Sequence, residues 1–339
     1  MRSVFFSHLV DGPAGDPALY IRVAHRREAI LFDCGSLARL APREMTKIRY
    51  LFVSHTHVDH FVDFDRLVRF FLYTDHHLTV FGPTGIAEQV GNRLAGYTWN
   101  LVDGYPFAIT VNEWNGSRID TYRFRARNEF RREEIDSTDC SDGQLLTTST
   151  YQITATALAH GSITSLAFTL QEVLHVAIHK DALELHGYQT GAWLTTFKDT
   201  LRSGMNLEEN IAVPLTGGAF VEKTAAELAG EIAHCEPGMK VCYVTDASPS
   251  GQNLQKIEEI SRDAHLLAIE APFAHIDLER AHHRNHLTAQ LAGEVARRAN
   301  VHRCLFFHFS PRYQQTGIDL HAEAQKAFIG EVLPPDAAR

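Results

Sequence analysis

Hydrophobic residues in the first third of the chain fall in short runs, and each run ends at polar residues or at glycine and proline. This punctuation is typical of β-strands. It predicts strands at 19–25, 28–35, 48–54 and 78–83, followed by two more at 151–160 and 165–171. Residues 61–73 instead place their apolar side chains at helical spacing, so they predict a helix after the third strand.

The second half of the chain repeats this alternation of strands and helices. Apolar runs predict strands at 210–215, 240–248, 265–272 and 302–310, and apolar stripes predict helices at 223–234 and 287–300. Two strand-rich halves with helices outside them predict an α/β fold, a four-layer αββα sandwich. We expect a single domain over residues 1–339, with a polar inserted arm at 172–210.

The composition narrows the class of protein. With 339 residues, 45% hydrophobic and 22% charged, the chain can bury the core of one large domain or two medium ones. No apolar window approaches the roughly 18 residues of a membrane span, and the N-terminus shows no signal-peptide cleavage site. Five scattered cysteines, never spaced C-x-x-C, disfavour disulfides and a cysteine-based zinc site. We therefore expect no membrane partner and a cytoplasmic location.

The net charge of −9 argues against a broad nucleic-acid-binding surface, although it leaves room for a local basic groove. Residues 122–132 (YRFRARNEFRR) offer one candidate for such a groove. Their alternation predicts that Arg123, Arg125 and Arg127 share one face of a strand, where they can bind a phosphate backbone. The alternative is a solvated hairpin face that the following acidic residues balance.

Residues 54–60 (SHTHVDH) concentrate three histidines and an aspartate between a predicted strand and a predicted helix. His55 and His57, two positions apart in a turn, can face one metal ion. Asp59 and His60, at the start of the helix, can face a neighbouring ion. The alternative is a polar loop in which Asp59 only caps the helix, but capping does not explain the whole H-x-H-x-D-H register.

Further residues able to bind metal follow apolar strands elsewhere in the chain, namely His160, Asp246 and His308. Imidazole and carboxylate ligands suit zinc, with manganese or iron as alternatives. We therefore predict two divalent metal ions with Asp246 as a bridge between two ligand sets, which are His55, His57 and His160 for one ion and Asp59, His60 and His308 for the other.

Taken together, these motifs resemble the metallo-β-lactamase superfamily of hydrolases. Four further stretches extend the resemblance to its ribonuclease Z-like branch: 78–86 (LTVFGPTGI), 269–275 (IEAPFAH), 285–296 (NHLTAQLAGEVA) and 305–313 (LFFHFSPRY). The similarity covers most of the chain. It implies a metallo-β-lactamase-like domain in which two metal ions hydrolyse a phosphodiester.

The resemblance also implies roles for individual residues. Asp59 would ligate metal and accept a proton from the attacking water, and His286 would pass a proton to the leaving group. Glu270 would orient His286, which makes physical sense because a carboxylate fixes the tautomer and favours the imidazolium. Arg312 is a candidate contact to the substrate phosphate, with a loop salt bridge as the alternative. Asp33 would organise the loop of residues 54–57, called the metal loop below, without binding metal.

The chain differs from this branch in two segments that affect substrate binding, the inserted arm and the opening loop. Residues 182–198 resemble the arm with which tRNA 3′-processing enzymes grip tRNA, but Thr190 and Ala192 replace its two prolines. Residues 172–210 hold three basic and six acidic side chains, a net charge of −3, whereas gripping phosphate favours basic residues. The opening loop SHLVDGPAGDP also replaces the glycine-rich loop of the branch.

Several functions therefore stay open. The first is a metal-dependent endonuclease that cuts precursor tRNA at its 3′ end, and the second is a phosphodiesterase for cyclic nucleotides. A lactonase or thioesterase on the same scaffold is a third reading, and a metal-binding protein without turnover is a fourth. The resemblance further implies a homodimer.

Overall fold

The structure is a computed structural model that describes residues 4–333. The chain folds into two compact units. The larger unit comprises residues 5–145, 153–169 and 240–333, and the smaller unit comprises Val4 together with residues 146–152 and 170–239. Every residue of the predicted metal centre belongs to the larger unit.

An eight-stranded sheet forms the first half of the larger unit, with its strands in chain order. The strands from β3 to β6 run parallel, and antiparallel pairs flank them. The bounds are β1 (Phe5–Leu9), β2 (Leu19–Val23), β3 (Ala29–Phe32), β4 (Ile48–Phe52), β5 (His77–Pro83), β6 (Ala108–Trp114), β7 (Arg118–Arg125) and β8 (Arg132–Asp139).

The second sheet has seven strands in the order β19-β18-β17-β16-β11-β10-β9, and its strands β16 to β19 run parallel. The bounds are β9 (Gln144–Thr147), β10 (Tyr151–His160), β11 (Ile163–Glu172), β16 (Lys240–Val244), β17 (Leu266–Glu270), β18 (Arg303–Phe307) and β19 (Glu331–Val332). Strands β16 and β17 are buried almost throughout, as expected for parallel strands covered on both faces.

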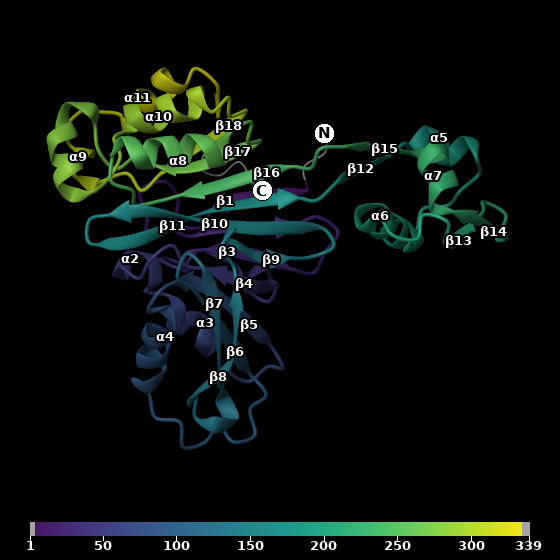
Figure 1. The fold of residues 1–339 in the computed structure, drawn as a ribbon, viewed down its shortest axis with the longest axis horizontal. Helices are drawn as coiled ribbons and strands as arrows, with labels where there is room; N and C mark the ends of the chain where they lie inside the picture. The colour runs from purple at the N-terminus through teal and green to yellow at the C-terminus, as the bar shows by residue number, and fades with distance from the viewer. Residues whose placement is uncertain (1–3, 334–339) are drawn as a thin grey trace. The chain divides into compact units, whose positions relative to one another are not determined.

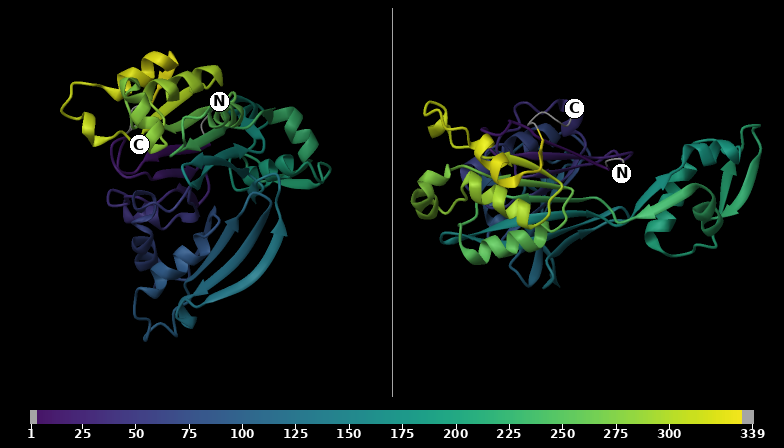
Figure 2. Two further views of the ribbon diagram at one scale, coloured as in Figure 1. Left: turned by 60° about the vertical axis from the view of Figure 1, so that its left-hand side comes forward. Right: turned by 90° about the horizontal axis from the view of Figure 1, so that it is seen from above.

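Aromatic side chains form the layer between the two sheets. The ring of Phe32 on β3 stacks on Phe168 of β11 and Tyr243 of β16, with ring centroids 5.4 and 5.5 Å apart. Helices α3 and α4 lie outside the first sheet, and α8, α10 and α11 lie outside the second (Figure 1). The two further views in Figure 2 show the same coverage of the second sheet. The predicted four-layer αββα arrangement is confirmed.

The helices of the larger unit begin at polar caps where the sequence offers them. The side chain of Ser250 accepts a hydrogen bond from Asn253 at the start of α8, and Thr288 and Asp319 do the same for α10 and α11. The bounds are α1 (Pro42–Met45), α2 (Val58–Phe61), α3 (Phe64–Phe71), α4 (Ile86–Ala95), α8 (Gly251–Ser261), α9 (Leu278–Arg284), α10 (Ala289–Arg298) and α11 (Leu320–Phe328), with short 3₁₀ turns η1 (Ala126–Asn128), η2 (His275–Asp277) and η3 (Pro311–Tyr313).

The smaller unit has its own apolar core, to which Trp193, Phe197 and Leu228 contribute. Two antiparallel strand pairs, β12–β15 and β13–β14, accompany its three helices. The bounds are β12 (His175–Ile178), α5 (Lys180–Leu185), α6 (Trp193–Ser203), β13 (Asn210–Pro214), β14 (Phe220–Thr224), α7 (Ala225–Ile232) and β15 (Ala233–Glu236). Buried Glu172 binds Arg202 and His175 within this unit, at 3.4 and 3.1 Å.

The predicted strands and helices are confirmed, with two corrections. The helix predicted at 61–73 is α3, which begins only at Phe64, because the N–H of Asp63 donates to the carbonyl of Cys34 (3.0 Å) and separates α3 from α2, which ends at Phe61. The prediction that three arginines share a strand face is wrong, since Arg127 lies in η1 after the strand has ended. Among residues 4–333, none of the helices has the length and apolar character that crossing a membrane requires.

Candidate metal centre

The candidate metal centre lies where parallel strands of both sheets end. The loop of residues 54–57 follows β4, Asp246 follows β16, and His308 follows β18. Because the carboxyl ends of parallel strands meet at one edge, residues far apart in the chain become neighbours. Asp59 and His308, 249 positions apart, approach to 3.3 Å between carboxylate oxygen and imidazole nitrogen.

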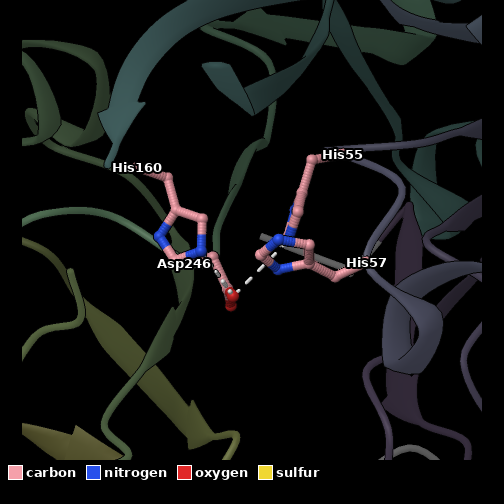
Figure 3. Close-up of side chains that lie close together, drawn as sticks. All are labelled: His55, His57, His160 and Asp246. Carbon is pink, nitrogen blue, oxygen red and sulfur yellow. Dashed lines mark ion pairs between the residues drawn. The ribbon is translucent and has the colours of Figure 1, made fainter. Parts of the chain in front are cut away.

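The first cluster combines three imidazoles with a carboxylate (Figure 3). His55, His57, His160 and Asp246 each offer a ligand atom within 4.8 Å of the others. Nε2 of His55 and Nε2 of His160 both lie 3.5 Å from Oδ2 of Asp246. His57 is exposed whereas the other three are buried, so the cluster is open to solvent on the His57 side.

The second cluster contains Asp59, His60 and His308, whose ligand atoms also lie within 4.8 Å of one another. Oδ2 of Asp59 is 3.5 Å from Nε2 of His60 and 3.3 Å from Nε2 of His308. Helix α2 presents the first two residues and the end of β18 presents the third. The structure thus brings together both ligand sets that the sequence predicts.

Asp246 lies between the two clusters. Its Oδ2 faces His55 and His160, while its Oδ1 lies 3.3 Å from Nε2 of His60 and 3.1 Å from Nδ1 of His308. One carboxylate oxygen therefore serves each cluster. This is the arrangement required of a carboxylate that bridges two cations.

The buried nitrogens of these histidines show whether the residues fit a metal. Nε2 of His55, Nε2 of His60 and Nδ1 of His308 are buried and have no hydrogen-bond partner within the described part of the chain. A buried polar atom without a partner is costly, and nearly all such atoms in proteins are satisfied. These nitrogens lie close to carboxylate oxygens but are not aligned for hydrogen bonds with them. A divalent metal ion would satisfy both kinds of atom, because imidazole nitrogens and carboxylate oxygens are ligands that such ions use.

The pKa values of the clustered histidines also favour a metal site. Burial lowers the pKa of His55 to about 2, so its imidazole is neutral and keeps a lone pair for a metal. Burial also opposes the charging of His60, but the carboxylates of Asp246 and Asp33 outweigh it and raise its pKa to about 10. The centre therefore attracts positive charge, which protons or divalent cations can supply, and metal binding is expected to release protons.

Asp33 holds the metal loop from behind and does not itself face the clusters. Its fully buried carboxylate accepts four hydrogen bonds, from the N–H of Ser54 (2.7 Å), the hydroxyl of Ser54 (2.8 Å), Nδ1 of His60 (2.9 Å) and the hydroxyl of Tyr243 (2.8 Å). The Ser54 hydroxyl also lies 3.1 Å from Nδ1 of His55. A carboxylate behind a ligating histidine fixes the ring orientation and strengthens the ligand.

The backbone at the centre is held in an unusual conformation. Asp33, Asp246, Asn285 and His308 all have positive φ, from 40° to 62°. Non-glycine residues rarely adopt this left-handed region, and each costs of order 1–3 kcal/mol that the surroundings must offset. Asn285 uses the conformation to place its carbonyl 2.9 Å from Nδ1 of His160. Such strain gathers at positions where side chains must be aimed.

The predicted histidine–glutamate pair forms beside the second cluster. Nδ1 of His286 lies 2.8 Å from Oε2 of Glu270, whose other oxygen accepts hydrogen bonds from the N–H groups of Ala247 (2.8 Å) and Leu287 (3.2 Å). Burial opposes the charging of His286, but Glu270 outweighs it and raises the pKa of the imidazole. This pair can therefore hold a proton on His286 next to the metal clusters.

Arg312 lies in η3 and is exposed, and within residues 4–333 it forms no ion pair with a carboxylate. The structure thus leaves it available to solvent.

Three residues that support the centre, Ser54, Tyr243 and Asn285, were not predicted from the sequence. Ser54 adjoins the histidine motif and offered a local signal. Tyr243 and Asn285 offered none, because their contacts depend on long-range packing.

No family model matches the chain, but relatives and solved structures do. It is 26% identical to ribonuclease Z of Deinococcus radiodurans over 308 residues, which cover 89% of each protein. It is also 26% identical to ribonuclease Z of Bacillus subtilis over 322 residues, which cover 92% of this chain and 88% of the relative. The solved metallo-β-lactamase fold protein YhfI of Bacillus subtilis matches with a TM-score of 0.55 at 17% identity, covering 96% of this chain and 94% of YhfI.

Proposed function

We propose that this chain, which has the metallo-β-lactamase fold and resembles ribonuclease Z along most of its length, is a metal-dependent phosphodiesterase of the ribonuclease Z type. The observation that carries the proposal is the position of Asp246, with one oxygen toward each histidine cluster and the His286–Glu270 pair beside it. A lone structural metal would not need this second cluster.

The two clusters would hold two divalent ions, with zinc first and manganese or iron as alternatives. One ion would use His55, His57 and His160, the other Asp59, His60 and His308, and Asp246 would bridge them. When bound, such ions supply a nucleophile from water near neutral pH and stabilise negative charge on the phosphate.

The protein's own groups would move the protons. Asp59 is partly exposed, so its carboxylate can accept a proton from the attacking water at the mouth of the site. Glu270 holds Nδ1 of His286, which leaves Nε2 to donate a proton to the leaving oxygen. Because Glu270 is fully buried and receives two backbone N–H groups, it can fix the tautomer without moving during turnover.

Two classes of substrate are consistent with the proposed phosphodiesterase activity, namely precursor tRNA and small phosphodiesters. Similarity to ribonuclease Z over nine-tenths of the chain favours cleavage of precursor tRNA at its 3′ end. The charge of the smaller unit favours a small phosphodiester such as a cyclic nucleotide, because residues 170–239 hold four basic and ten acidic side chains, a net charge of −6. An acidic unit repels a phosphate backbone, and phosphate contacts dominate RNA affinity.

The deciding experiment compares these substrates on metal-analysed protein. One reaction contains precursor tRNA with a 3′ trailer, and the others contain cyclic nucleotides and bis(4-nitrophenyl) phosphate. Protein stripped with a chelator is the control for each. Metal-dependent cutting of any diester supports the proposed chemistry, and the substrate with the highest kcat/KM decides between the two readings. A fully loaded protein that hydrolyses none of them would show that the proposal is wrong.

Assembly and location complete the proposal. The resemblance implies a homodimer, which light scattering on the purified protein tests directly. All five cysteines are free thiols, which suits a reducing compartment such as the cytoplasm. Arg312, exposed and without a carboxylate partner in the described part of the chain, is our candidate for a contact to the substrate phosphate.

A further inference from the structure

A hollow of about 280 Å³ in the larger unit borders the first metal cluster. His55 and Thr56 of the metal loop line one side of it. The other walls come from the loop after β5, the turn between β6 and β7, and the hairpin of β10 and β11, where Ile163 lies. A group bound in this hollow therefore touches the loop that presents the metal ligands.

The chemistry of the walls selects the kind of occupant. Among the residues that the structure describes, no lysine, arginine, aspartate or glutamate lines the hollow, so it offers nothing to a second phosphate or to a further cation. Gln89 and Asn115, whose side chains carry amides, line it together with Trp114. Three threonines complete the polar lining, namely Thr56, Thr84 and Thr164. Neutral hydrogen-bonding groups beside an aromatic ring suit a nucleobase and its sugar.

The polar groups are positioned before any ligand arrives. Oδ1 of Asn115 accepts three hydrogen bonds within its own turn, at 3.0–3.1 Å, which leaves the amide nitrogen as a donor. The side chain of Gln89 makes no hydrogen bond within residues 4–333, so both ends of its amide remain for a ligand. Nε1 of Trp114 donates to the carbonyl of Cys140 (2.9 Å), which fixes the indole.

We propose that this hollow, the nucleoside pocket, binds the nucleoside that stays on the phosphate when the diester is cut. The proposal rests on the proposed phosphodiesterase function. His286, the proton donor to the leaving group, does not line the pocket, whereas the ligand His55 does. The volume of about 280 Å³ lies just below the roughly 300 Å³ at which small-ligand sites begin, so it suits one nucleoside and not two.

Two diesters with the same leaving group test the pocket. Thymidine 5′-(4-nitrophenyl phosphate) carries a nucleoside, and methyl 4-nitrophenyl phosphate carries none. The ratio of their kcat/KM values is measured for the wild-type protein and for Ile163→Trp, which fills the pocket. Ile276→Trp is the matched control, because Ile276 is 85% exposed and lies outside the pocket.

We expect the wild-type ratio to favour the thymidine diester by about tenfold, the scale of one base–aromatic contact. Ile163→Trp should abolish this preference, and Ile276→Trp should keep it. If the ratio of the two kcat/KM values is the same in all three proteins, the nucleoside pocket is refuted and the phosphodiesterase function still stands. If the loaded protein hydrolyses neither diester, thymidine binding by saturation-transfer NMR decides. A signal lost only in Ile163→Trp supports the pocket without the function, and any other pattern refutes the pocket.

Discussion

Replacing Asp33 with asparagine tests how the fold aims the metal ligands. The carboxylate is fully buried, and its two oxygens accept four hydrogen bonds from Ser54, His60 and Tyr243. Asparagine fits the same space and tolerates the positive φ of 56°. Its amide nitrogen, however, is a donor and must face at least one of the four donors.

The expected cost follows from these contacts. A buried donor left without an acceptor costs about 1–3 kcal/mol, and hydrogen bonds to a neutral oxygen are each about 1 kcal/mol weaker than bonds to a charged one. Loss of the charge also removes its desolvation cost, which offsets part of the total. We therefore expect Asp33→Asn to lower the free energy of unfolding by about 3 kcal/mol. Metal affinity should fall by about 10- to 100-fold, because the orientation of His60 is lost.

Urea denaturation in the presence of a chelator measures the first effect without a contribution from bound metal. Calorimetric titration of stripped protein with zinc measures the second. Asp65→Asn is the matched control, because Asp65 binds Arg93 at 3.1 Å on a partly exposed surface and should cost below about 1 kcal/mol. If Asp33→Asn were as stable as this control and bound zinc like the wild-type protein, the proposed role of Asp33 would be refuted.

Three further predictions concern the centre itself. His57→Ala should lose metal and hydrolysis together, whereas His286→Ala should keep its metal and lose about 10²- to 10⁴-fold in kcat, which metal analysis and turnover on one preparation distinguish. Because Glu270 raises the pKa of His286, the proton donor is retained above pH of about 6.5 and lost as pH rises through the raised value. Glu270→Gln should therefore move the alkaline limb of the kcat profile to lower pH, and an unmoved limb would contradict the pairing. Gly35→Ala should reduce metal content, since a Cβ there collides with a backbone carbonyl of α2, while Gly104→Ala, whose Cβ meets open space, should not.

Local patterns in the sequence predict much of the centre. The stretch 54–60 holds four of the ligand-type residues within one strand-to-helix turn, so its geometry depends on few contacts. Apolar runs marked the strands β16 and β18, and a residue able to bind metal after each run, Asp246 and His308, marked their carboxyl ends. The likeness to ribonuclease Z supplied the pairing of His286 with Glu270, which the structure forms at 2.8 Å.

Other features depend on contacts that no local pattern records. The hydroxyl of Tyr243 reaches Asp33 across 210 positions of the chain. Strand β15 pairs with β12 in the smaller unit, and the paired residues lie 55 to 61 positions apart in the chain, from Ile178 with Ala233 to His175 with Glu236. Alternation placed Arg127 on a strand, but the chain turns into η1 because the N–H of Glu129 bonds back to the carbonyl of Ala126. The periodicity of apolar residues predicts which segments form helices and strands. It does not predict where tertiary contacts end them.

A zinc titration of stripped protein, in which bound metal and hydrolysis of bis(4-nitrophenyl) phosphate are followed together, tests the two-metal centre most directly. A centre with two clusters should bind two zinc ions per chain and reach full turnover only when both clusters are filled, and Asp246→Asn should lose both properties. Saturation at one ion, or turnover that does not depend on metal, would contradict a two-metal phosphodiesterase.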